Sequence, residues 1–172
     1  MGDQANAAGR DRTVGFVKCL PANYPAIRLI ERPTNWKPDK ATSIAQTIIT
    51  ATPELSAIYM QSDSIMFPGV TSVLRSAGKL GHIFLASIDG APPALRAIRD
   101  GYMDIIVSQP LDLYAQYSVH YAKAALDGKI FRPDLHVWTR SRRSPNRRRH
   151  RGPEPGRIAP SREFLSFGRP PI

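Results

Sequence analysis

Apolar and polar residues along the first 126 positions follow two periods that alternate with each other. Short apolar runs predict strands over residues 27–31, 55–60, 83–88 and 104–108. Apolar residues spaced three and four apart predict helices over residues 6–20, 38–52, 68–77, 92–100 and 111–126. This alternation implies an α/β fold with an open parallel sheet, right-handed crossovers and helices on both faces.

Proline and glycine residues set the expected ends of these helices. Pro21 is expected to stop the first helix, because proline lacks the N–H that a helix interior needs. Pro38 fits the first turn of the second helix, and Pro53 ends it. Gly78 and Gly101 are natural caps for the third and fourth helices.

Polar residues follow three of the expected strands at the point where each strand ends. Gln61-Ser62-Asp63 follows one strand, Asp89 ends the next before Gly90, and Gln109 follows the last. Open α/β sheets place their ligand crevices outside the carboxyl ends of their strands. We therefore expect these side chains to share one edge of the sheet.

Charge divides the chain into two parts. The formal net charge is +10, but residues 1–131 carry 13 basic and 11 acidic residues, whereas residues 132–172 carry 11 arginines and 3 acids. The tail also lacks an apolar period and is rich in proline, so it cannot bury enough surface to offset its ordering entropy. We expect one domain over residues 1–135 and a disordered, basic Arg/Pro-rich segment over residues 136–172.

Several kinds of site and segment are not indicated. Cys19 is the only cysteine, which excludes an intrachain disulfide, and the four histidines lack ligand-like spacing, so we expect neither a metal nor a cofactor. No apolar run approaches the roughly 18 residues of a membrane span. The first ten residues lack the apolar core of a signal peptide, so the chain as written is expected to remain in the cytoplasm.

Six segments in this order resemble the type I periplasmic sugar-binding proteins, the ribose-binding-like receptors of bacterial ABC transporters. The resemblance covers roughly residues 5–135. These segments are Arg10-Asp11-Arg12-Thr13-Val14-Gly15-Phe16, Trp36, Ala57-Ile58-Tyr59-Met60-Gln61-Ser62-Asp63, Ala77-Gly78-Lys79, Ser87-Ile88-Asp89-Gly90 and Ser108-Gln109-Pro110.

The resemblance implies a particular architecture. Members of this family have two α/β lobes that close over a sugar, and the matching part is mainly the second lobe. The crossing between lobes falls at Gln109-Pro110, and the helix over residues 111–126 belongs to the first lobe. A closing strand should follow residues 131–135, where the basic segment begins instead. We interpret the chain as a fragment whose tail is read in a shifted frame.

The resemblance also implies a function and partners. It suggests non-covalent binding of a sugar or polyol, delivery to ABC transporter permease subunits, a periplasmic location and no enzymatic reaction. Because only one lobe is present, we expect binding to be impaired. The helix over residues 111–126 has lost the sheet on which it would pack, so we expect self-association through it.

Five residues match the ligand contacts of the family. Arg10 offers a forked donor, and Trp36 offers a ring that can stack on a sugar. Asp89 can accept from two hydroxyls, and Gln109 can both donate and accept. Ser62 stands where many members have Asn, which changes the hydrogen-bond pattern. The structural alternatives for Arg10 and Trp36 are a surface arginine and a tryptophan that covers the core. The alternatives for Asp89, Gln109 and Ser62 are a turn or N-cap aspartate, a polar hinge residue and a plain strand-end serine.

Three other classes of function are weighed against this one. Asp63 and Asp89 could form an acid/base pair, but no phosphate loop, nucleophile elbow or metal cluster accompanies them, and the family pattern places Asp63 in support of the loop. A ligand-sensing domain of a lac-repressor-type transcriptional regulator shares the fold. The arginines of the tail could bind phosphates without specificity, so we expect no specific nucleic-acid partner.

Overall fold

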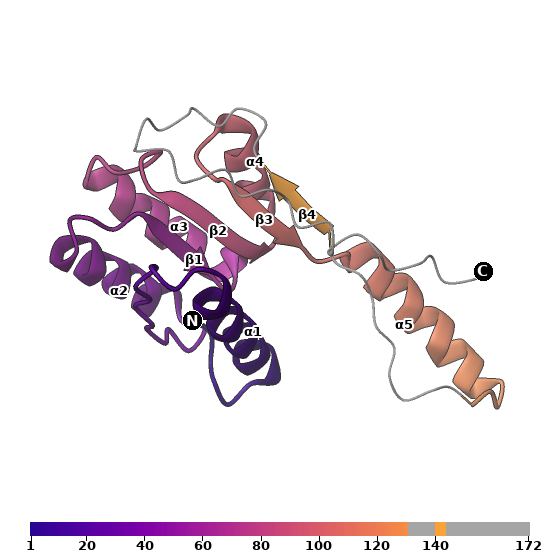
Figure 1. The fold of residues 1–172 in the computed structure, drawn as a ribbon. Coiled ribbons are helices and arrows are strands. Elements are labelled where there is room, and N and C mark those ends of the chain that lie inside the picture. Colours follow the sequence, from indigo (N-terminus) through magenta and orange to yellow (C-terminus); the bar gives the residue numbers. More distant parts are fainter. Residues whose placement is uncertain (131–139, 144–172) are drawn as a thin grey trace.

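A four-stranded sheet forms the centre of the protein. The computed structural model describes residues 1–130 and 140–143. Within these residues the strand order is β1-β2-β3-β4, with β1 paired parallel to β2 and β2 parallel to β3 (Figure 1). The fourth strand pairs antiparallel to β3. The four strands are β1 (Ala57–Met60), β2 (Phe84–Asp89), β3 (Ile105–Ser108) and β4 (Arg140–Arg143).

Helices alternate with the parallel strands, which confirms the predicted α/β fold. The bounds of α4 and α5 coincide with those expected from the sequence, and α2 starts at Pro38 as expected. The left-handed Gly101 ends α4, where a residue with a Cβ would be strained. The five helices are α1 (Ala7–Asn23), α2 (Pro38–Ala51), α3 (Asp63–Ser76), α4 (Pro92–Asp100) and α5 (Leu111–Leu126).

Adjacent residues of β1 show that helices cover both faces of the sheet. The ring of Tyr59 stacks on Phe16 of α1, with ring centroids 4.4 Å apart. The next residue, Met60, is buried in the core with residues of α2 and α3. Successive side chains of a strand point to opposite faces, so α1 lies on one face and the α2–α3 pair on the other.

Both helices that contain an internal proline differ from the prediction. The first helix does not stop at Pro21 but continues to Asn23, whose side-chain Nδ2 donates to the Cys19 carbonyl at 2.8 Å. That bond supports the last turn beyond the proline. The third helix begins at Asp63 rather than Pro68, because Ser62 is its N-cap and Pro68 lies inside it.

The strand predicted over Ile27–Glu31 is wrong, because these residues form no regular element. A strand is stable only when a neighbour pairs with its backbone. The residues that follow this segment bond to the start of the chain. Met1 N–H donates to the Arg32 carbonyl and Thr34 N–H donates to the Met1 carbonyl, both at 2.8 Å. The apolar side chains Ile27 and Leu29 are consequently exposed.

The disorder predicted from residue 136 is wrong for residues 140–143, which form β4 along the free edge of β3. The edge of a sheet presents unpaired N–H and C=O groups to which any extended segment can bond, whatever its composition. The rest of that prediction, and the domain boundary at residue 135, lie outside the described residues.

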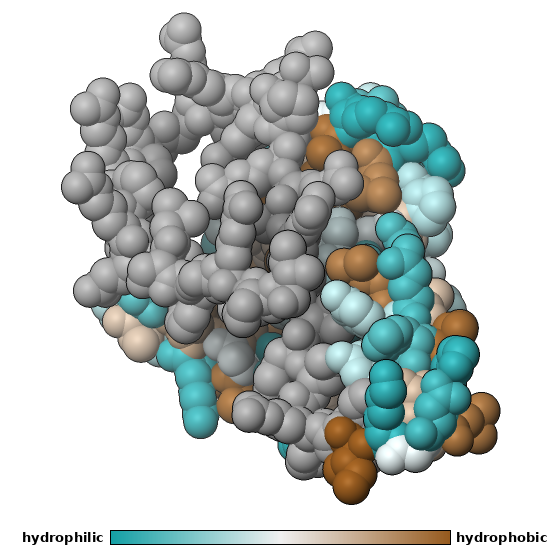
Figure 2. Space-filling model, turned by 90° about the vertical axis from the view of Figure 1, so that its right-hand side faces the viewer, coloured by the Kyte–Doolittle hydropathy of each residue, from teal (hydrophilic) through white to brown (hydrophobic). Residues whose placement is uncertain are grey.

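The core and α5 have opposite environments. Leu74, Leu85 and Ile106 are completely buried between the sheet and its helices. In contrast, α5 projects away from the sheet (Figure 1), and Ala124 is its one buried residue. Figure 2 views the molecule from the side toward which α5 extends and shows hydrophobic side chains scattered among hydrophilic ones. None of the described helices is long and apolar enough to cross a membrane.

Candidate functional site

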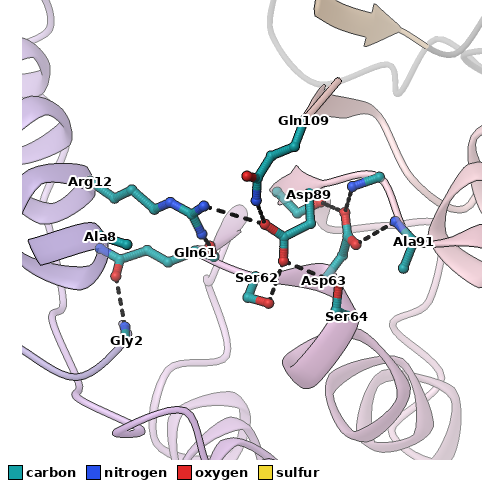
Figure 3. A network of polar contacts seen from close by, with 12 residues as sticks. Gly2, Ala8, Arg12, Gln61, Ser62, Asp63, Ser64, Asp89, Ala91 and Gln109 are labelled. Carbon is teal, nitrogen blue, oxygen red and sulfur yellow. Dashed lines mark hydrogen bonds and ion pairs between the residues drawn. The ribbon is translucent and has the colours of Figure 1, made fainter. Parts of the chain in front are cut away.

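The carboxylate of Asp89 is the centre of a polar network at the carboxyl end of β2 (Figure 3). Its Oδ2 accepts hydrogen bonds from the hydroxyls of Ser62, at 2.5 Å, and Ser64, at 3.2 Å. Its Oδ1 accepts from Nε2 of Gln109 at 2.5 Å and lies 3.4 Å from a guanidinium nitrogen of Arg12. Four elements therefore meet at one carboxylate.

The backbone at Asp89 is unusual in a way that positions its side chain. Asp89 has a φ of 114° and the following Gly90 a φ of 90°, a region that L-residues rarely adopt. A Cβ at Gly90 would lie 2.9 Å from the Ser108 hydroxyl, so only glycine fits there. The backbone carbonyl of Asp89 accepts from Gln109 N–H at 2.9 Å. These features hold the turn against the end of β3.

Asp63 fixes the turn behind Asp89 rather than facing the network. It is almost completely buried, and its Oδ1 accepts from Ala91 N–H at 2.8 Å. Its Oδ2 accepts from Gly90 N–H at 3.0 Å and from the Ser87 hydroxyl at 2.8 Å. Burial raises the pKa of Asp63, and these hydrogen bonds oppose the rise. The carboxylate therefore acts as a structural brace.

Arg12 links the network to an aromatic residue. Its guanidinium donates to the Gln61 carbonyl and lies 6.0 Å from the centre of the Trp36 ring, within the range of a cation–π contact. Trp36 has a left-handed backbone, with a φ of 57°, and its ring packs directly on Gly2. The ring is thus held beside the charged cluster.

Gln61 and Tyr59, at the carboxyl end of β1, adjoin the network. Gln61 is almost fully buried; its Nε2 donates to the Thr13 hydroxyl and its Oε1 accepts from Gly2 N–H, both at 2.7 Å. Burial raises the pKa of Tyr59 to about 12; nearby Arg12 lowers it and Asp89 raises it. Tyr59 is therefore neutral at physiological pH and adds no charge to the site.

The structure brings together four of the five residues predicted from the sequence. Ser62, Asp89 and Gln109 are directly bonded, and Trp36 is joined to them through Arg12. Arg10 is not among them, because it is exposed and pairs with its neighbour Asp11 at 3.4 Å.

Arg12 and Ser64 are the members of the network that were not expected from the sequence. Residues two apart on a helix point roughly 200° away from each other, so Arg10 and Arg12 of α1 cannot serve the same site. The contact of Phe16 with Tyr59 fixes which side of α1 faces the sheet, and this rotation, which the sequence did not reveal, separates the two arginines. Among the described residues, no group of three His, Cys, Asp or Glu side chains converges as a metal site would require.

Comparison with protein families identifies the class of protein to which this fold belongs. Residues 1–130 match the family described as the periplasmic binding protein domain. The match covers most of the chain, and the protein belongs to this family.

Curated relatives are sugar-binding proteins by name. The D-allose-binding periplasmic protein of Escherichia coli is 28% identical over 130 residues, which are 75% of this chain and 42% of that protein. The ribose import binding protein of Salmonella typhimurium is 27% identical over 129 residues, which are 75% of this chain and 43% of that protein. The chain thus spans less than half the length of these relatives.

Solved structures show the same fold. A periplasmic solute-binding protein of an ABC transporter from Actinobacillus succinogenes, with bound D-allose, superposes with a TM-score of 0.74 at 23% identity. The superposition covers 79% of this chain and 47% of that one. A solute-binding protein from Mycobacterium smegmatis with bound glycerol gives a TM-score of 0.74 at 25% identity, over 85% of this chain and 50% of that one.

Proposed function

We propose that residues 1–130 provide one wall of a sugar-binding site in the binding component of a bacterial ABC-type sugar importer. The observation that carries this proposal is the convergence of Ser62, Gln109 and Arg12 on the Asp89 carboxylate at the ends of the strands. Membership of the periplasmic binding protein family supports it, as do relatives named for allose and ribose.

The chemistry of the cluster suits a polyhydroxylated ligand. Sugars present adjacent hydroxyls that donate and accept, and planar polar groups can bond two of them at once. The Asp89 carboxylate accepts, the Arg12 guanidinium donates, and the Gln109 amide does both. Each is already aligned by its neighbours, which lowers the cost of ordering these side chains when a ligand binds.

An aromatic ring completes the proposed wall. Trp36 lies beside Arg12 and offers an apolar face on which the carbon skeleton of a sugar ring can stack. The proposed ligand contacts are therefore Asp89, Gln109, Ser62 and Trp36, with Arg12 taking the place expected for Arg10.

Binding by this wall alone should be weak and non-covalent. High affinity for a small ligand requires a site that encloses most of its surface. The described residues supply contacts only at the carboxyl ends of the strands of one sheet, so we expect affinity well below that of a two-lobed receptor. The proposed role is capture of a sugar and its delivery to permease subunits, without a chemical step.

Titration with D-ribose and D-allose, followed by NMR, tests this proposal. The Trp36 indole N–H and the Gln109 side-chain amide should shift together and saturate at high sugar concentration, and Asp89→Ala should abolish both shifts. Trp36→Phe and Gln109→Met assign the two signals. The absence of any shift with sugars or polyols would refute the proposed site, whereas micromolar affinity would refute only the expectation of weak binding.

A further inference from the structure

The Asp89 carboxylate has no acceptor position left for a ligand. A carboxylate has two oxygens and about four lone-pair directions. Oδ2 accepts from the hydroxyls of Ser62 and Ser64 (Figure 3). Oδ1 accepts from the Gln109 amide and faces the Arg12 guanidinium at 3.4 Å, and only 16% of the side chain is exposed. A ligand hydroxyl can therefore donate to Asp89 only if one of these four groups moves away.

Three of the four groups are costly to remove. Ser62 is 3% exposed, so its hydroxyl would lose a 2.5 Å bond with little water to replace it. Arg12 and Asp89 are both mostly buried, so separating this ion pair would leave two charges without partners. Gln109 is held twice, because its backbone N–H bonds the Asp89 carbonyl at 2.9 Å while Nε2 bonds the carboxylate at 2.5 Å.

Ser64 differs from these three groups. It lies in the first turn of α3 and is exposed, and its hydroxyl lies 3.2 Å from Oδ2, the longest of the three hydrogen bonds to this carboxylate. Water can bond the hydroxyl as soon as it leaves Asp89, so no buried polar atom loses its partner. Ser64 is therefore the group whose displacement costs least.

We propose that Ser64 competes with the sugar, because a ligand hydroxyl takes the place of the Ser64 hydroxyl on Oδ2 of Asp89. This inference rests on the proposed sugar site and identifies the partner of Asp89 that a ligand replaces. The exchange keeps the carboxylate within its acceptor capacity, whereas a ligand bond without it would exceed that capacity. Ser64 thus lowers the affinity of the site, while Ser62 keeps its bond to the same oxygen.

The sign of a change in affinity tests this proposal. D-ribose and D-allose are titrated into the full chain, and the dissociation constant is read from the shifts of the Trp36 indole N–H and the Gln109 amide. Ser64→Ala removes the competing bond, so affinity should rise by about two- to tenfold, the equivalent of one ordinary hydrogen bond. Ser62→Ala should lower the affinity. Ser72→Ala, at an exposed serine of α3 outside the network, should leave it unchanged.

Two further measurements separate competition from a purely structural role. Ser64→Thr keeps a hydroxyl at this position and should return the affinity to that of the unmodified chain. In urea denaturation, Ser64→Ala should lower the stability without sugar but not at saturating sugar, since the bond is already broken in the complex. A purely structural role would give the same loss of stability in both conditions.

The outcomes distinguish this inference from the sugar site on which it rests. If both signals shift with sugar but Ser64→Ala lowers the affinity or leaves it unchanged, competition by Ser64 is overturned and the sugar site stands. An equal rise in affinity for Ser64→Thr and Ser64→Ala would also overturn it, because the hydroxyl would then have no effect. If neither sugar shifts the signals in the unmodified chain or in Ser64→Ala, both the sugar site and the competition are overturned.

Discussion

The hydroxyl of Ser62 and the carboxylate of Asp89 form a 2.5 Å hydrogen bond that joins the start of α3 to the end of β2. Ser62 is the N-cap of α3, yet its side chain makes no capping bond to that helix. The hydroxyl is directed to the candidate ligand site instead. A bond of this kind to an ionised group is stronger than one between neutral groups.

Replacing this serine should therefore weaken the protein. Ser62→Ala is expected to lower the free energy of unfolding by about 1.5–3 kcal/mol, the usual range for a hydrogen bond to a charged group. Ser64→Ala is the matched control, because its hydroxyl bonds the same Asp89 oxygen at 3.2 Å and is exposed, so its effect should be smaller. Urea denaturation measures both. Equal losses of stability in the two variants would show that the Ser62 bond contributes no more than the Ser64 bond.

Arg12 and Arg10 offer a second matched pair. Arg12→Ala removes a mostly buried guanidinium that bonds the Gln61 carbonyl and faces Asp89, and should cost about 1–2 kcal/mol of stability. It should also lower the affinity for sugar, measured from the shift of the Trp36 indole, by at least about tenfold. Arg10→Ala removes an exposed side chain and should change neither quantity. A larger effect from Arg10→Ala would return that residue to the site.

The hydrogen bonds of the buried Asp63 carboxylate predict a loss of stability when it is replaced by an amide. Asp63→Asn replaces one carboxylate oxygen with an NH₂ group. The Gly90 N–H and the Ser87 hydroxyl then lose an acceptor or face another donor. The variant should be less stable by about 1–3 kcal/mol at neutral pH. Urea denaturation measures the loss. The conservative control is Asp39→Asn, an exposed first-turn acid of α2, which should cost less than about 1 kcal/mol.

The raised pKa of Asp63 also predicts how the stability of the unmodified protein changes with pH. Burial raises the pKa of Asp63 above its ordinary value of 3.8, so the folded protein holds its proton more tightly than the unfolded chain. This contribution to stability is present below pH 3.8 and is lost as the pH rises through the raised folded-state pKa. Asp63→Asn should lack it. Identical pH profiles for the two proteins would contradict the burial-driven shift.

The sequence predicted the elements whose signals are local. The helical period over residues 92–100 is bounded by proline and glycine, and α4 follows it residue for residue. Proline inside α3 misled the prediction, because the N-terminus of that helix depends on Ser62 and on the long-range bonds of Asp63. The segment Ile27–Glu31 has the pattern of a strand, but pairing is a property of the neighbour and cannot be read from the segment itself.

The candidate site was predictable to the extent that the sheet topology fixes it. Asp89, Gln109 and Ser62 end or follow parallel strands, so their meeting follows from strand order alone. Choosing between Arg10 and Arg12 required the rotation of α1 against β1, which the Phe16–Tyr59 stack sets. The sequence pattern of α1 is weakly amphipathic, so its facing side could not be deduced beforehand.

Tyr59 predicts a loss of stability in strong base. Its pKa is raised from 10.0 to about 12 by burial, so the folded protein keeps the phenol proton that the unfolded chain releases. Stability should therefore fall as the pH rises from 10 toward 12, and Tyr59→Phe should remove this part of the fall. Ultraviolet absorbance of tyrosinate, with Tyr102→Phe as an exposed control, measures the titration. Ionisation of Tyr59 near pH 10 would contradict the prediction.

The exposed apolar residues of α5 predict concentration-dependent self-association. Leu111, Val119 and Leu126 are 62%, 73% and 89% exposed, and no described helix or strand covers them. Burying such side chains against a second copy is favourable by about 25 cal/mol per Å² of apolar surface. Sedimentation velocity should show dimers or larger species that Val119→Lys with Leu126→Lys shifts toward monomer. Tyr102→Lys, a single substitution by lysine at an exposed residue outside α5, should leave the distribution unchanged, whereas Val119→Lys alone should change it. A monomer at every concentration, or equal effects of both variants, would show that α5 is not the contact surface.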